Sequence, residues 1–264
     1  MMRKAIYLIT IIAAVFVAGK SKAQHSYFPT EGTILYDKTV HTKNLLKRHI
    51  STLKDDNFSQ KYYEELMDRV SETAVLKKKV SFRGNEMSME SVAETYDPIL
   101  SNLLRSGLLD YQQTLYQDLS KSVSKSTFEI GGSPVLIQDS LLQVKWKITN
   151  EYRNIAGYDC RRANGVTLDS VYVVAFYTDQ IPLSAGPGTV HGLPGMILGL
   201  VVPEQHFNIY ATEVTYGAPV IKNISERKRD KPLTRKEAHS TLKGVLGRWM
   251  SDQQFNLLIA AMFL

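Results

Sequence analysis

The 264-residue chain carries 32 basic and 26 acidic residues, which gives a formal charge of +6 at neutral pH. Residues 1–23 hold four of the basic side chains and no acidic one, so the remaining chain carries only +2. This near balance argues against nucleic-acid binding, which needs a strongly basic face. The single cysteine, Cys160, excludes an intramolecular disulfide and a dithiol redox pair.

Residues 1–23 have the pattern of a secretory signal peptide. A basic start precedes an apolar run of fifteen residues that ends at Gly19, and Ser21 and Ala23 place small residues before a cleavage point. This run is shorter than the about 20 residues of a membrane span. We therefore predict a cleaved signal and a mature chain, residues 24–264, that is one β-rich domain without a transmembrane span. It is expected in the periplasm, associated with the outer membrane, or outside the cell.

Alternation of apolar and polar residues predicts a long series of strands joined by short turns. We expect strands at residues 31–42, 111–119, 126–130, 135–138, 143–149, 158–163, 169–178, 196–202 and 206–216, and a hairpin over residues 72–95 that turns at Gly84-Asn85. A flat sheet of this size would leave an apolar face and two edges uncovered. The predicted fold is therefore mainly β, a β-rich α+β protein with a curved antiparallel sheet, a half-barrel or bowl, and one or two covering helices.

The helical signals interrupt this series near both ends of the mature chain. Residues 45–69 carry apolar side chains at a spacing of four, which predicts an amphipathic helix with Asn57 as its N-cap. The stripe consists of Phe58, Tyr62, Leu66 and Val70.

Three further stretches complete the helical pattern. Residues 97–106 predict a short helix or a loop. Thr234 and Glu237 form a capping-box pattern that opens a helix through about Trp249. The apolar residues 255–264 are too few to cross a bilayer and are expected to pack back onto the domain.

Residues 181–198 contain four glycines and three prolines, interleaved with apolar side chains that require burial. This pattern indicates a shaped loop fixed to the core, not a linker. Two interpretations stay open. The glycines either provide tight turns into the next strand, or they free backbone NH groups to form an anion-binding nest for a carboxylate, phosphate or peptide end.

Residues 192–197, Gly-Leu-Pro-Gly-Met-Ile, resemble the signature of the GLPGLI family of secreted Bacteroidota proteins, with Met196 in place of leucine. The resemblance extends upstream to Trp146 and Ile148 and to Gly157-Tyr158-Asp159-Cys160. It implies an envelope protein of unassigned activity, with an accessory role beside outer-membrane transport such as TonB-dependent uptake. It gives no catalytic residues to carry over.

Candidates for chemistry are few, because the chain contains no nucleophile elbow, zinc-protease motif or phosphate-binding loop. His191, His206 and Cys160 would form a mixed metal site if strands brought them together, but their spacing is not that of metal ligands. We expect no metal or cofactor, and expect Cys160 to be a buried hydrophobe. The ligand-binding candidates are Tyr158, Tyr177, Gly186, His191, Gly192 and Gly195.

Three functions follow from these observations. The first is a secreted, non-enzymatic protein that binds a lipid or peptide ligand, or an outer-membrane transport or other envelope protein. The second is a hydrolase or metal-dependent enzyme that uses His191 with carboxylates or Cys160. The third is a structural or assembly component that docks through residues 255–264.

Overall fold

The computed structural model describes residues 28–53, 57–111, 113–130, 133–167, 170–225, 231–248 and 250–264. The predicted signal peptide, residues 1–23, lies outside the described residues. So does Trp249, at which the predicted C-terminal helix ends.

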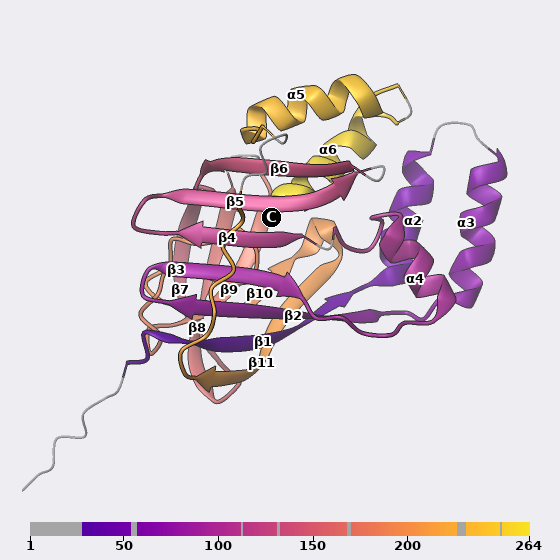
Figure 1. The fold of residues 1–264 in the computed structure, drawn as a ribbon. Coiled ribbons are helices and arrows are strands. Elements are labelled where there is room, and N and C mark those ends of the chain that lie inside the picture. The colour runs from indigo at the N-terminus through magenta and orange to yellow at the C-terminus, as the bar shows by residue number, and fades with distance from the viewer. Residues whose placement is uncertain are drawn as a thin grey trace, which may run out of the picture.

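The strands form one antiparallel sheet in the order β6-β5-β4-β3-β2-β1-β11-β10-β9-β8-β7 (Figure 1). They are β1 (Glu31–Val40), β2 (Ala74–Arg83), β3 (Glu86–Ser91), β4 (Thr114–Asp118), β5 (Val123–Ile130), β6 (Ser133–Ser140), β7 (Val144–Ile155), β8 (Tyr158–Thr167), β9 (Tyr172–Thr178), β10 (Met196–Val202) and β11 (Phe207–Tyr216). Strands β6 and β7 follow each other in the chain but occupy opposite edges, so the sheet is not closed. The prediction of a mainly β protein with an antiparallel sheet is confirmed.

The sheet curves so that its two halves face a shared core. In Figure 1 strands β1 to β6 lie in front of β7 to β10. Phe82 of β2 and Val173 of β9 belong to the same cluster of buried side chains, although six strands lie between β2 and β9 in chain order. The inward residues of both halves therefore pack against each other, as the alternation predicts.

Strand β7 departs most from the prediction, since it continues past Thr149 to Ile155. Its pairing with β8 shifts register between Ile148 and Tyr152, which marks a bulge or irregularity. Most side chains in the added part are exposed. In this part of β7 the side chains do not alternate between the core and solvent. The apolar alternation in the sequence therefore ends before the strand ends.

The stretch 45–69, predicted as one helix, is divided in two, and its second helix begins at Asn57, where the helix start was predicted. The chain instead forms α2 (Thr42–Thr52) and α3 (Asn57–Arg69), with α4 (Pro98–Arg105) packed nearby (Figure 1). Asp97 caps α4 by accepting hydrogen bonds from the first amides of the helix.

The predicted apolar stripe of α3 is also corrected. Phe58 and Tyr62 are 84% and 52% exposed, whereas Tyr63, Leu66 and Met67 pack against the cluster that α2 and α4 share. A strict spacing of four drifts around a helix of 3.6 residues per turn. The buried face therefore includes residues three apart as well as four apart.

Helices α5 (Arg235–Leu246) and α6 (Asp252–Phe263) cover the β5–β6 side of the sheet (Figure 1). The predicted capping box of Thr234 and Glu237 is present, and α5 ends at Leu246, three residues before the predicted end, with Gly247 as its C-cap. The apolar residues 255–264 do pack back, with Phe255 fully buried. None of the helices in the described ranges is long and apolar enough to cross a membrane.

Candidate functional site

The glycine-rich stretch between β9 and β10 lies inside the curve of the sheet. Ile181, Val190 and Leu193 are almost completely buried and share one cluster with Ile34 of β1 and Val80 of β2. The stretch therefore fills part of the hollow that the curved sheet would otherwise leave, in agreement with a loop fixed to the core.

Glycines in this stretch stand where a larger residue does not fit. At Gly188, with φ +85°, an added Cβ would lie 2.2 Å from the carbonyl oxygen of Leu264. At Gly195, with φ +151°, it would lie 2.0 Å from the carbonyl oxygen of Thr178. A Cβ at Gly186 would approach the Ile197 side chain to 2.7 Å. These contacts support the interpretation in which the glycines allow close packing.

Amides that could form an anion-binding nest already have acceptors. Gly192 N donates to Ser184 Oγ at 3.0 Å. Gly195 N donates to the carbonyl oxygen of Leu193 at 2.8 Å. An anion would have to displace these bonds, so the geometry does not favour a preformed nest.

His191 lies half-buried in the same stretch. Trp146 Nε1 donates to its backbone carbonyl at 2.9 Å. Burial lowers the pKa of the imidazole, a hydrogen bond with the backbone of Leu142 acts in the opposite direction, and the charge of Arg235 lowers it further. Nε2 has no hydrogen-bond partner within the described part of the chain. Among the residues that the structure describes, the ring has backbone and cationic neighbours, and no carboxylate there affects it as the orienting group of a general base would.

The residues weighed as a mixed metal site are not brought together. Cys160 is buried on β8 near Tyr36, and burial, with the charge of Asp159, raises the pKa of its thiol to about 12. His206 follows the short helix η1 (Pro203–Gln205) and lies near the charges of Arg48 and His41. Over the described ranges, no three His, Cys, Asp or Glu side chains are grouped to hold a metal ion.

The two predicted tyrosines lie in the wall of the core. Tyr177 on β9 is 5% exposed and belongs to the central cluster, and Tyr158 at the start of β8 is half-buried against it. Neither lines the large cavity of the structure, and none of the other ligand-binding candidates does. From the glycine-rich stretch only Pro187 and Gly188 reach that cavity, within the described residues.

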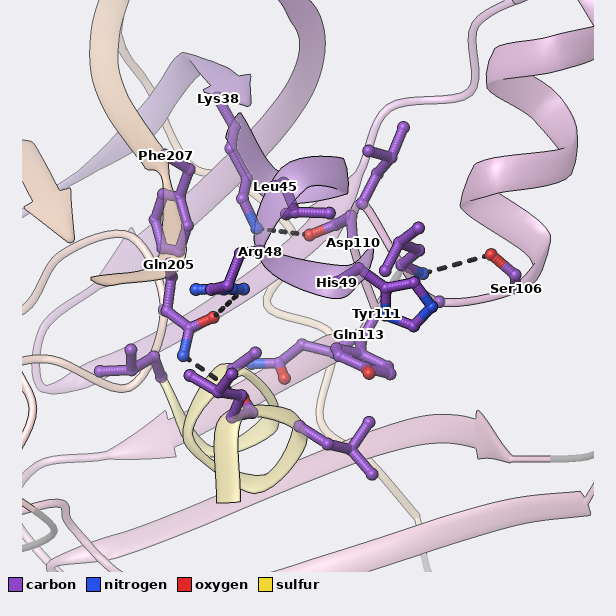
Figure 2. Close-up of a pocket in the computed structure, with 18 of the residues that line it drawn as sticks. Lys38, Leu45, Arg48, His49, Ser106, Asp110, Tyr111, Gln113, Gln205 and Phe207 are labelled. Carbon is purple, nitrogen blue, oxygen red and sulfur yellow. Dashed lines mark hydrogen bonds and ion pairs between the residues drawn. The ribbon is translucent and has the colours of Figure 1, made fainter. Parts of the chain in front are cut away.

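This cavity, of about 370 Å³, lies between the sheet, α2 and α6 (Figure 2). Its walls come from β1, β2, β10 and β11, from the segment that follows α4, and from the two helices. Most of the lining is apolar, and includes Leu45, Leu109, Leu200, Phe207, Ile209, Leu257, Leu258, Ala261 and Leu264. A hollow with these walls can hold an apolar ligand or an apolar part of a larger one.

A buried charge cluster forms one part of the cavity wall. Lys38 Nζ lies 2.6 Å from Asp110 Oδ1, and Lys78 Nζ binds the other carboxylate oxygen and donates to Ser91 Oγ at 2.8 Å. Side-chain exposures are 15% for Lys38 and 8% for Asp110. Burial alone would raise the pKa of Asp110, but the two ammonium groups hold it at about 2. Burial lowers the pKa of Lys78, against the effect of Asp110.

Arg48 of α2 adds a third cation to the wall. It donates to the backbone carbonyl of Glu204 and, at 3.3 Å, to Gln205 Oε1. The Gln205 side chain is buried, and its Nε2 donates to the carbonyl oxygen of Leu257 at 3.3 Å. Gln205 therefore links α2 to α6 across the cavity, as Figure 2 shows. Burial lowers the pKa of Arg48, whereas Glu204 and Tyr111 raise it.

The sequence contains a signal for this cluster that the strand prediction did not use. In β1 the inward residues are Ile34, Tyr36 and Val40, and Lys38 occupies the remaining inward position. Lys78 stands in the same way between Leu76 and the following inward residues of β2. A lysine on the apolar face of a strand requires a buried partner. Its partner, Asp110, lies outside the strands and could not be assigned without the fold.

Comparison with known proteins gives a match to part of the chain. A family model described as a protein of unknown function (Porph_ging) matches residues 165–199, from the end of β8 through the glycine-rich stretch into β10. No curated protein matches the chain. Over these residues the chain is similar to a Bacteroidota-associated family of unknown function.

Proposed function

We propose that this chain is a non-enzymatic binding protein that holds a lipid tail, such as an acyl chain, in the cavity between the sheet, α2 and α6. The observation that carries the proposal is a cavity of about 370 Å³ with mostly apolar walls. Ligand sites in proteins typically measure about 300–1,000 Å³ and combine apolar walls with a few polar groups.

The energetics of such a ligand are favourable. Each methylene moved from water into the cavity contributes about 0.8 kcal/mol, so a chain of about ten methylenes would gain about 8 kcal/mol. Immobilising the ligand offsets part of this gain. The Leu257, Leu258 and Ala261 side chains of α6 line the cavity, so this helix would cover one side of the bound chain.

The place of action forms part of the same proposal. A secreted binding protein of the periplasm or the outer-membrane surface fits the signal-peptide pattern of residues 1–23. The resemblance to GLPGLI proteins and the partial match to a Bacteroidota-associated family support an accessory role beside an outer-membrane transport protein. In that role the chain would carry or shield an apolar molecule between membrane sites.

The two other functions receive less support. A hydrolase that uses His191 would need a carboxylate or thiol beside the ring, whereas the described neighbours that affect the ring are the Leu142 backbone and the Arg235 charge. An assembly function of residues 255–264 would require them to leave a packed position, since Phe255 and Met262 are buried against β5, β6 and α5.

Displacement of a fluorescent apolar probe tests the proposal. The purified mature chain is loaded with N-phenyl-1-naphthylamine and titrated with dodecan-1-ol, a neutral ligand with one alkyl chain. We expect saturable displacement from one site. Absence of saturable binding of both the probe and dodecan-1-ol would refute the proposed function.

A pair of variants on α6 locates the site. Ala261→Trp places an indole in the cavity and is expected to abolish dodecan-1-ol binding. Asn256→Trp adds the same group to an exposed position of α6 that does not line the cavity, and is expected to bind as the unmodified chain does. If Ala261→Trp fails to fold, Ala261→Leu provides a smaller obstruction. Equal binding by the Ala261 and Asn256 variants would place the ligand elsewhere.

A further inference from the structure

We infer that the ligand is a single-chain amphiphile with an anionic head group, a carboxylate or a phosphate, held between Lys38 and Arg48 of the cavity wall. This inference rests on the proposed function, because it assigns the chemistry of the head group to a ligand whose tail occupies the cavity.

Charge is the first observation behind it. Lys38, Lys78 and Arg48 line the cavity, and Asp110 is the carboxylate that faces them among the described residues. The Glu204 carboxylate raises the pKa of Arg48 through its charge. The hydrogen bond from Arg48, however, goes to the backbone oxygen of Glu204. His49 is not counted as a positive group, because burial and the charge of Arg48 lower its pKa. The wall therefore carries more positive than negative groups.

Burial makes this excess of charge costly. A cation withdrawn from water is stable only with a close anion and filled hydrogen bonds. Lys78 has both, from Asp110 and Ser91. Lys38 has one carboxylate oxygen of the same Asp110 and rests 4.2 Å from the centre of the Phe207 ring. One carboxylate is thus shared by two ammonium groups, and an anion from the ligand would restore the balance.

The donors for such an anion are available. An ammonium group offers three N–H donors and a guanidinium five. Arg48 uses two of its terminal nitrogens on neutral acceptors, the Glu204 carbonyl and the Gln205 amide, and on no carboxylate within the described ranges. A guanidinium binds a carboxylate or phosphate in preference to a neutral oxygen, because charge-assisted hydrogen bonds are roughly twice as strong.

The charged part of the cavity wall and the apolar part belong to the same cavity. Lys38, Arg48, Asp110 and Tyr111 line the same cavity. Figure 2 shows Lys38 and Asp110 directed toward each other, with Arg48 beside Gln205 and the α6 helix beyond. The apolar side chains of α6 line the same cavity. If the head group binds the cations, the alkyl chain of the ligand therefore lies along α6.

Three ligands with the same alkyl chain test the inference on the unmodified protein. Binding of laurate, dodecyl phosphate and dodecan-1-ol is measured by probe displacement at neutral pH, with inorganic phosphate as the ligand without a chain. We expect at least one of the anionic amphiphiles to bind about tenfold or more tightly than dodecan-1-ol, since a hydrogen bond to a charged group contributes about 1.5–3 kcal/mol. Which anion is preferred separates carboxylate from phosphate head groups.

The outcomes distinguish the inference from the function on which it rests. If dodecan-1-ol binds as tightly as both anions, the cavity holds a tail and the inference about the head group is wrong. If none of the amphiphiles binds, both proposals fail. Tight binding of inorganic phosphate alone would also contradict the inference, because it requires a ligand with a tail.

Charge-removing variants identify the anchor. Arg48→Met and Lys38→Met are each expected to reduce the preference for the anionic ligand over dodecan-1-ol by about tenfold. Lys47→Met removes the same charge from the exposed side of α2, outside the cavity, and is the matched control. Equal losses in the Lys47 and Arg48 variants would show that the effect is only long-range attraction, and would overturn the assignment.

Discussion

Replacing Gly188 with alanine is expected to destabilise the fold more than the same replacement at Gly157. Both glycines have left-handed backbones, with φ +85° and +87°. The surroundings differ, because a Cβ at Gly188 would lie 2.2 Å from the Leu264 carbonyl oxygen, whereas a Cβ at Gly157 meets nothing within 4 Å. The pair therefore separates backbone strain from close packing.

The expected magnitudes follow from the contacts. Alanine in the left-handed region costs about 1–2 kcal/mol, and this is the whole effect expected for Gly157→Ala. At Gly188 the clash also displaces the Leu264 backbone, whose oxygen accepts hydrogen bonds from Thr189 N at 2.6 Å and from Thr189 Oγ1 at 3.1 Å. These two bonds are worth about 1 kcal/mol each. Gly188→Ala should therefore lower the free energy of unfolding by about 3–4 kcal/mol.

Urea unfolding followed by circular dichroism measures both changes. The free energy of unfolding is obtained from the midpoint and the slope of the transition for each variant and for the unmodified chain. The reduced flexibility of the unfolded chain contributes equally to the two variants, so it cancels in their difference. Equal destabilisation would refute the reasoning, because it would mean that the glycine-rich stretch does not hold the end of α6 in place.

Two further predictions concern buried groups. Stability should fall as pH is lowered from about 4 to about 2, because the pKa of Asp110 is about 2 in the fold and 3.8 ordinarily; the depressed pKa contributes about 2 kcal/mol above pH 4. Acid titration of urea midpoints should show this loss, and Asp110→Asn, which leaves two buried cations, should remove that part of the pH dependence. The Cys160 thiol, whose pKa is raised to about 12, should react with Ellman's reagent only after unfolding, and fast reaction of the native chain at neutral pH would contradict its burial.

Periodicity was a reliable guide where one face of an element meets the core. Strand β1 alternates up to Tyr36, with Ile34, Tyr36 and Val40 fully buried, and its bounds were predicted to within two residues. The capping box of α5 was equally clear, because it depends on residues three apart in the chain. Local patterns of this kind do not require knowledge of distant neighbours.

The spacing of apolar residues was less informative for the α2–α3 region and for β7. The single helix predicted over residues 45–69 is a pair, α2 and α3, since apolar spacing does not show where a chain reverses. Strand β7 extends beyond its apolar part because pairing with β8, and not burial, holds its second half. In both cases the deciding contacts come from other segments.

The sequence by itself determined the mainly antiparallel β-sheet, the fixed glycine-rich stretch, the burial of Cys160 and the return of residues 255–264 to the core. Each of these follows from local periodicity, residue size or backbone freedom. The tertiary structure alone decided which residues line the cavity. Lys38, Arg48 and Asp110 come from a strand, a helix and a connecting segment, and they line one cavity only in the folded chain. Charges that are distant in the chain carry no periodic signal of their contact, so a site of this kind depends on the fold.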